Sequence, residues 1–265
     1  MRTVTAIAAL IGGLALTPSA FAHTPYLKPT TFAPDRPFVT VEAALTEGAF
    51  FIPDLPIRGE GDYLVTGNSG VAAKAGTPLA LKEFTLVEVA LPEDGTYRIS
   101  TGDRAGRTGR WVKADGAWRP IGPADAAGLP AGAETMTTQV YVKAETYVTR
   151  GSPTQGALKP GGQGLEVSPV THPNEVFAKE AFRFVLLYDG KPVANVPFGV
   201  ARGGDAYAET RYTYAGKTDA AGAAAVTFAQ PGVYVLETHY PERAEGSTTP
   251  IARSVAYSLT FEVTR

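Results

Sequence analysis

Apolar and polar residues alternate strictly in several short segments of the chain, and this pattern predicts β-strands. In the C-terminal segment SVAYSLTFEV (254–263), the large apolar side chains occupy every second position, from Val255 to Val263. A two-residue period of this kind indicates a strand with one buried face and one solvated face. Asp-Gly dipeptides at 115–116 and 189–190 predict tight hairpins, because such pairs readily adopt positive φ. The pattern contains no convincing amphipathic helix.

Two segments of the chain resemble each other and indicate a repeated unit. TLVEVALPEDGTYRIS (85–100) and AAVTFAQPGVYVLE (224–237) both run from an apolar strand through a Pro/Gly turn into Gly-x-Tyr. The motif resembles the tyrosine corner of immunoglobulin-like sandwiches, in which the phenol hydroxyl holds the turn that enters a strand. We therefore expect an all-β chain with two immunoglobulin-like or fibronectin-like β-sandwich domains.

The densest Gly/Pro/Ser stretch after the N-terminal segment is RGSPTQGALKPGGQG (150–164), and it suggests where the two domains meet. The domains predicted from this stretch are a signal peptide over 1–22, an N-terminal sandwich over 23–150, a Gly/Pro-rich connection over 151–164 and a C-terminal sandwich over 165–265.

The first 22 residues have the composition of a secretory signal peptide. A single positive charge at Arg2 precedes an apolar run over about 6–16 and the small-residue pattern Ala20-Phe21-Ala22. The apolar run is too short to span a bilayer, so we expect cleavage after Ala22 and an exported protein, periplasmic in a bacterium, that does not span the membrane once mature. The mature chain would then begin with His23.

Composition narrows the chemistry that the protein can perform. The chain has no cysteine, which excludes disulfides, thiolate metal sites and thiol nucleophiles. Its formal net charge of −2 argues against nucleic acid as a partner, because phosphate binding requires a basic face. The sequence has no nucleophile elbow, zinc-helix, phosphate-loop or EF-hand motif. No catalytic residues are assigned.

The three histidines are the candidate metal ligands. After cleavage, His23 would carry a free α-amine beside its imidazole, and the two nitrogens can chelate one ion. Glu237 and His239 lie two residues apart on a predicted strand and share a face, opposite the face that holds Tyr234 and Leu236. Nitrogen donors suit nickel, cobalt, copper or zinc far better than calcium or magnesium.

His172 lies in the loop sequence VTHPNEVF, where its imidazole can bind a metal or a backbone group of the turn. Trp111 and Trp118 flank the Asp115-Gly116 turn and are expected to lie diagonally on one face of that hairpin. This pair suits either buried packing or a sugar-stacking platform.

Several stretches together resemble the periplasmic family called domain of unknown function 4198. They are AHTPYLKP, the region from Glu145 to Tyr207, TDAAG and PGVYVLE. The resemblance implies an exported, β-rich protein that begins with His, here His23, and carries a His-Pro-Asn turn, here residues 172–174. Some members are linked to nickel or cobalt uptake. The family often has Trp where this chain has Tyr26.

The sequence thus predicts a periplasmic binding protein for a transition-metal ion or a small metal complex in uptake or homeostasis. His23 would chelate the metal, and His239 with Glu237, or else His172, would complete the site. An envelope transporter is a possible partner. Two alternatives stay open: a copper-dependent, monooxygenase-like enzyme with an N-terminal His, and an envelope or adhesion module without metal.

Overall fold

The structure, a computed structural model, describes residues 23–57, 61–122, 128–129, 131–204, 207–244 and 246–265. The segment predicted as a signal peptide, residues 1–22, lies outside the described residues. The described residues form β-strands and turns, and none of them forms an α-helix. Within these ranges, no helix is long and apolar enough to cross a bilayer.

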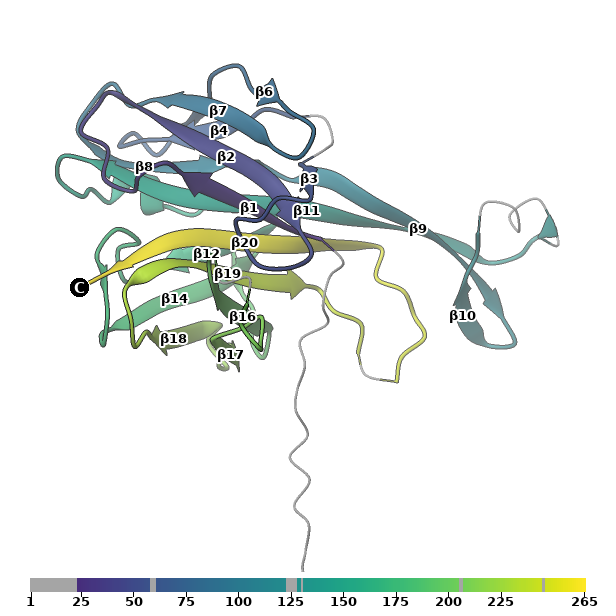
Figure 1. The fold of residues 1–265 in the computed structure, drawn as a ribbon. Coiled ribbons are helices and arrows are strands. Elements are labelled where there is room, and N and C mark those ends of the chain that lie inside the picture. The colour runs from purple at the N-terminus through teal and green to yellow at the C-terminus, as the bar shows by residue number, and fades with distance from the viewer. Residues whose placement is uncertain (1–22, 58–60, 123–127, 130, 205–206, 245) are drawn as a thin grey trace, which may run out of the picture.

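The strands form three sheets that are stacked in layers (Figure 1). The first sheet contains β1 (Thr24–Pro29), β2 (Phe38–Thr46), β3 (Leu55–Pro56), β6 (Leu79–Ala80) and β7 (Thr85–Ala90). The third sheet contains β12 (Leu165–Pro169), β14 (Ala181–Tyr188), β15 (Lys191–Pro192) and β18 (Ala223–Thr227).

The middle layer is a long sheet that runs through the whole molecule. Its path begins with β17 (Tyr214–Lys217), β16 (Pro197–Arg202), β19 (Gly232–Tyr240) and β20 (Arg253–Thr264). The path continues with β11 (Thr135–Arg150), β8 (Gly95–Ser100), β4 (Leu64–Thr66) and β5 (Ala72–Lys74). The strands β9 (Arg104–Ala114), β10 (Ala117–Pro120) and β13 (Val176–Phe177) pair beside this path.

Each outer sheet covers one face of the long sheet, which creates two separate hydrophobic cores. The first core packs the first sheet on β8 and β11 with Val41, Val87, Ile99 and Val148, among others. The second core packs the third sheet on β19 and β20 with residues such as Phe182, Phe184, Leu236, Leu259 and Phe261. The predicted fold class, an all-β chain with two immunoglobulin-like sandwiches, is confirmed.

The two sandwiches share one continuous sheet because β11 and β20 pair in parallel, from Gln139 opposite Arg253 to Thr146 opposite Thr260. The stretch predicted as a connection, residues 151–164, contains a 3₁₀ turn at Gly156–Leu158. Ala157 and Leu158 of this turn are buried in the second core.

Both predicted tyrosine corners are present. The Tyr97 hydroxyl donates to the carbonyl of Glu93 at 2.7 Å, and the Tyr234 hydroxyl donates to the carbonyl of Gln230 at 2.8 Å. Both hairpin turns also form: Asp115 and Asp189 have φ of 51° and 48°, and each is followed by a positive-φ glycine.

The prediction of one solvated face on the last strand is wrong. The apolar residues of β20 enter the second core as expected, but Ala256, Ser258 and Thr260 on the opposite face are buried as well. The cover is β1, which crosses this face and accepts a hydrogen bond of 2.5 Å from Ser258 at the carbonyl of Pro25. The pattern within a strand cannot show that another layer will pack on its polar face.

A layer of charged side chains is buried inside the second sandwich, between the long sheet and β12. Glu166 lies within 3.9 Å of Arg98 and 3.8 Å of Lys143, and its oxygens accept the backbone N–H groups of Gly161 and Gly162. Glu145 accepts a hydrogen bond of 2.8 Å from Tyr257. Coulombic attraction from Lys143 and Arg98 lowers the pKa of Glu145, although burial opposes this shift. Arg98, Lys143, Glu145 and Glu166 are called the buried charged layer below.

Candidate functional site

The two sandwiches also meet away from the shared sheet, where the start of the described chain lies against the second sandwich. This seam is formed by His23 and Thr24, the turn around Glu47, and the side chains of Arg211 and Glu237. An apolar cluster packs beneath the seam and joins the two sandwiches through Tyr26, Ala44, Phe50, Ala201 and Val235.

His23 is the first described residue, and it lies at the open end of the seam. Its Nε2 is 3.2 Å from Oε1 of Glu47. The side chains of His23 and Glu47 are 35 % and 57 % exposed, so both remain accessible to a dissolved ion. Glu47 was not among the sequence-predicted site residues, because only the turn after β2 brings this carboxylate to the N-terminal strand.

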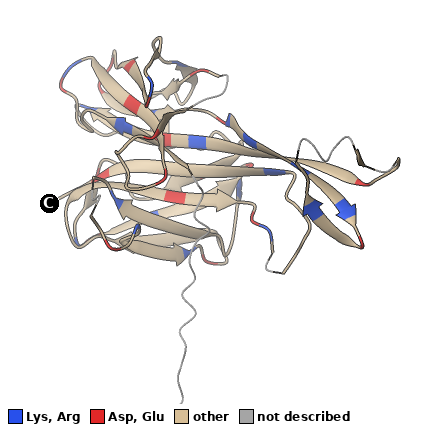
Figure 2. Cartoon of the chain, turned by 45° about the vertical axis from the view of Figure 1, so that its right-hand side comes forward, with Lys and Arg blue, Asp and Glu red and all other residues tan. Residues whose placement is uncertain are grey.

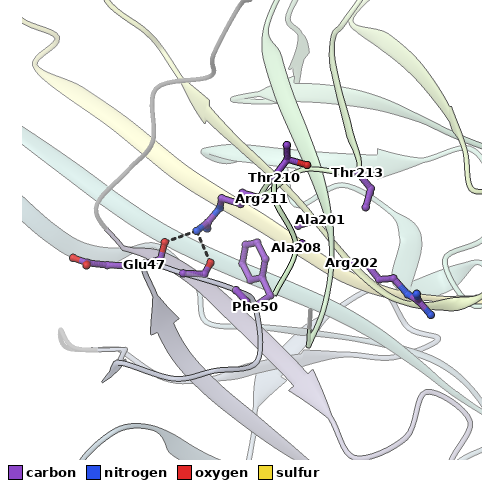
Figure 3. A pocket seen from close by; sticks show the side chains of 10 residues that line it. Glu47, Phe50, Ala201, Arg202, Ala208, Thr210, Arg211 and Thr213 are labelled. Carbon is purple, nitrogen blue, oxygen red and sulfur yellow. Dashed lines mark hydrogen bonds between the residues drawn. The ribbon is translucent and has the colours of Figure 1, made fainter. Parts of the chain in front are cut away.

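Arg211 clamps the two sandwiches together across the seam. One terminal nitrogen donates at 2.6 Å to the carbonyls of both Glu47 and Gly48, as Figure 3 shows. The other donates at 3.0 Å to the Thr24 hydroxyl and at 3.0 Å to the Glu237 carboxylate. The guanidinium also lies 4.8 Å from the centre of the Phe50 ring. The Arg211 guanidinium therefore donates hydrogen bonds to three separate segments of the chain.

Glu237 and His239 lie on β19, on the face opposite Tyr234 and Leu236, as their parity predicted. The sequence did not predict that β1 covers this face. Glu237 and His239 pair with Ser258 and Ala256, which are on the covered face of β20. Both residues line a small cavity of about 20 Å³, together with Thr24, Glu242 and Tyr257. Burial lowers the pKa of His239 to about 4, so its imidazole is neutral near pH 7. Burial also raises the pKa of Glu242.

A larger cavity of about 250 Å³ opens beside the clamp. Its walls come from the turn after β2, which carries Glu47 and Phe50, and from the second sandwich at Arg202, Thr210 and Thr213 (Figure 3). The cavity is large enough for a small organic molecule, whereas the cavity beside His239 has room for little more than one water molecule.

His172 lies in a different part of the molecule and is held by its own network. It is 5 % exposed, its Nε2 is 3.0 Å from the Thr96 hydroxyl, and its Nδ1 accepts the backbone N–H of Asn174 at 3.2 Å. The Nε2 atom is also 3.3 Å from the carbonyl of Thr154. Since Nδ1 accepts a hydrogen bond, the proton of the neutral ring resides on Nε2. Burial lowers the pKa of His172.

His172 and His239 lie toward opposite ends of β20. The loop of His172 leads into β13, whose Val176 pairs with Val263, while His239 pairs with Ala256. Seven residues along a strand span roughly 23 Å. The structure therefore brings His23, Glu237 and the Glu47 turn to one seam and leaves His172 elsewhere. Among the described residues, no three His, Asp or Glu side chains form a ready-made metal cluster.

Comparison with known proteins gives one clear match. The model of the family described as "Domain of unknown function (DUF4198)" matches residues 20–242. No curated protein matches the sequence. Two solved structures show a loose likeness at 12 % identity: the D0-D1 domain of Intimin and the D00-D0 domain of Intimin. The match to the first structure covers 89 % of this chain and 96 % of the Intimin chain, with a TM-score of 0.21. The second covers 91 % and 100 %, with a TM-score of 0.22.

Proposed function

The chain belongs to the DUF4198 family, as its sequence motifs predicted, and from this premise we propose that it is a periplasmic carrier of transition-metal ions. The ion would be nickel, cobalt, copper or zinc, free or in a small complex, and an envelope transporter would receive it. The observation that supports this proposal is the contact of His23 with Glu47 at the accessible end of the seam.

Export would complete the ligand set at His23. Cleavage after Ala22 frees an α-amine on the residue whose imidazole already lies 3.2 Å from a carboxylate. Amine, imidazole and carboxylate would supply two nitrogens and one oxygen, a donor set suited to late first-row transition metals. Both nitrogens must lose a proton before they bind, so affinity falls as the pH is lowered.

Glu237 and His239 have a secondary part in this proposal. Thr24, the neighbour of His23, lines the same small cavity as both residues. Glu237 is already paired with Arg211 at 3.0 Å, so a metal ion that engages Glu237 must displace the guanidinium. We therefore assign the first contacts to His23 and Glu47 and place Glu237 and His239 behind them. His172 is left out of the site, because its ring nitrogens are engaged in the separate network.

Calorimetric titration with Cu²⁺, Ni²⁺, Co²⁺ and Zn²⁺ tests the proposal on protein that begins with His23. The matched variant carries one additional alanine before His23, which removes the free amine from the chelate and leaves every side chain in place. We expect at least one of these ions to bind, and to bind at least tenfold more weakly to the extended variant. Glu47→Gln should weaken binding to a smaller degree, and His172→Gln should not change it. Equal affinity for His23-initiated and extended protein would refute the proposal.

A further inference from the structure

A long, narrow arm extends from the body of the molecule (Figure 1). It consists of the β9–β10 hairpin and the first residues of β11, which pairs with β9 from Thr135 opposite Val112 to Thr138 opposite Gly109. In the described part of the chain, no residue between 105 and 122 belongs to a hydrophobic core. The arm thus contributes little to the packing of the sandwiches. The loop between β19 and β20 touches it, where the backbone N–H of Trp118 donates to the Thr248 hydroxyl at 3.3 Å.

The arm has the opposite charge from the chain as a whole. Residues 105–121 include four Arg and Lys and a single acidic residue, whereas the formal net charge of the chain is −2. Figure 2 shows basic positions along the arm. Of the exposed cations, Lys113 is paired with Glu134 at 3.0 Å and Arg119 with Asp115 at 3.6 Å, both exposed pairs. Exposed pairs of this kind are weak and can exchange partners with a bound anion.

The strand register separates the arm into two faces. Arg119 pairs with Val112, and Arg110 pairs with Thr137, so the two arginines share one face with threonine hydroxyls of β11. Trp118 pairs with Lys113 and Trp111 pairs with Pro120, which places both tryptophans diagonally on the other face, as predicted. Arg110 and Arg119 are exposed, and both tryptophans are partly exposed.

Each tryptophan ring has a cation beside it. The ammonium of Lys113 is 5.8 Å from the Trp118 ring, and the guanidinium of Arg243 is 5.8 Å from the Trp111 ring. An indole ring offers a flat apolar surface with a polar edge, and a cation near it can bind an anionic group of a molecule stacked on the ring. The arm therefore combines aromatic surfaces, hydroxyls and positive charges along one narrow ribbon.

We propose that this arm binds a linear acidic polysaccharide. Sugar rings would stack on the tryptophan face, and carboxylates of the polymer would pair with Lys113 and Arg243, the cations beside the two rings, which is the charge complementarity that this face offers. A membrane surface suits the arm less, because the described hairpin turn, Asp115-Gly116, carries no large apolar side chain for insertion. Nucleic acid suits it less as well, because a duplex carries about one charge per 1.7 Å and the chain as a whole is acidic.

The protein provides its own probe for this proposal. Trp111 and Trp118 are the two tryptophans of the chain, so intrinsic tryptophan fluorescence reports on the arm alone. Metal-free protein would be titrated with polygalacturonate and, in parallel, with its methyl ester, which has the same backbone and blocked carboxylates. We expect a saturable fluorescence change with the acidic polymer, weakened at least tenfold when NaCl is raised from 50 to 200 mM, and none with the ester.

The arm variant Lys113→Gln/Arg243→Gln, which removes the cations beside the two rings, should bind polygalacturonate at least tenfold more weakly. Arg183→Gln/Lys191→Gln, which changes two exposed cations of the third sheet, is the matched control and should bind like the wild type. Circular dichroism would verify that each variant is folded. Absence of a saturable change, an equal response to the ester, or equal affinity in the arm variant would overturn the proposal. Tighter binding to phosphatidylglycerol vesicles or single-stranded DNA would also overturn it.

Discussion

Two groups of charged side chains join the layers of this molecule, and they differ in their access to water. In the buried charged layer, the side chains of Arg98, Lys143, Glu145 and Glu166 are at most 10 % exposed. In the seam, exposure rises from 12 % at Glu237 to 57 % at Glu47.

This difference determines what each group can do. A charge deep inside the sandwich must keep its partners, because an unpaired buried ion is very costly. A carboxylate at the edge of the seam can release its partner, because both groups are then solvated. An incoming cation can therefore take the place of that partner. The same residue types therefore support stability in one place and exchange in the other.

The largest expected effect is the loss of one carboxylate from the buried charged layer. Glu166→Ala leaves Arg98 and Lys143 without this partner and removes the acceptor of two backbone N–H groups. Breaking a buried ion pair typically costs about 3–5 kcal/mol. Urea denaturation would measure the free energy of unfolding beside Glu180→Ala, an exposed glutamate whose removal should cost under about 0.5 kcal/mol. Equal stability of the two variants would contradict the comparison.

The second largest loss of stability should follow from replacing Arg211, which clamps the two sandwiches at the seam. Arg211→Gln removes the charged donor to the carbonyls of Glu47 and Gly48 and leaves Glu237 without its ion-pair partner. Hydrogen bonds of charged groups contribute about 1.5–3 kcal/mol, and we expect a loss of unfolding free energy in this range. Arg211→Lys should recover only part of it, because an ammonium cannot reproduce the planar fork. If thermal melting shows that Arg211→Gln is as stable as the wild type, the clamp has no structural role.

A smaller effect should appear as acid sensitivity. Burial lowers the pKa values of His172 and His239, the latter to about 4, whereas an unfolded His has a pKa of about 6.5. As the pH falls below 6.5, the unfolded chain therefore binds protons that the native chain does not, and stability decreases. Each such histidine contributes a slope of up to about 1.4 kcal/mol per pH unit. Unfolding free energies measured between pH 7 and 5 should fall less steeply for His172→Gln than for the wild type.

The smallest effect should follow from changes at the open end of the seam. His23→Ala and Glu47→Gln break a partly exposed contact of 3.2 Å, and exposed ion pairs contribute only about 0–1 kcal/mol. We expect changes in unfolding free energy below about 0.5 kcal/mol in metal-free protein. If His23→Ala lowers the unfolding free energy by about 2 kcal/mol or more, His23 is a structural residue like His172. That result would contradict the proposed carrier function.

Local pattern predicted much of the fold correctly. Alternation identified the core face of β20, the two Asp-Gly dipeptides marked their hairpins, and Gly-x-Tyr located both tyrosine corners. These features depend on residues close together in the chain. The same reasoning placed Glu237 and His239 on the face of β19 away from the core, which is the face they occupy.

The candidate site depended on contacts between distant segments. Arg211 bridges Thr24, the turn at Glu47 and Glu237, and nothing in the sequence around Arg211 indicates such partners. The role of Glu47 likewise follows only from the approach of its turn to the N-terminal strand.

The sequence by itself therefore determined strand faces, turns and the repeated sandwich unit, because side-chain periodicity and turn conformation are properties of a few consecutive residues. Tertiary structure alone decided that β11 and β20 pair in parallel, that the polar face of β20 is covered, and that His23 and His172 have different surroundings. Packing between layers depends on surfaces assembled from many segments, and no single segment encodes the surface that it will meet.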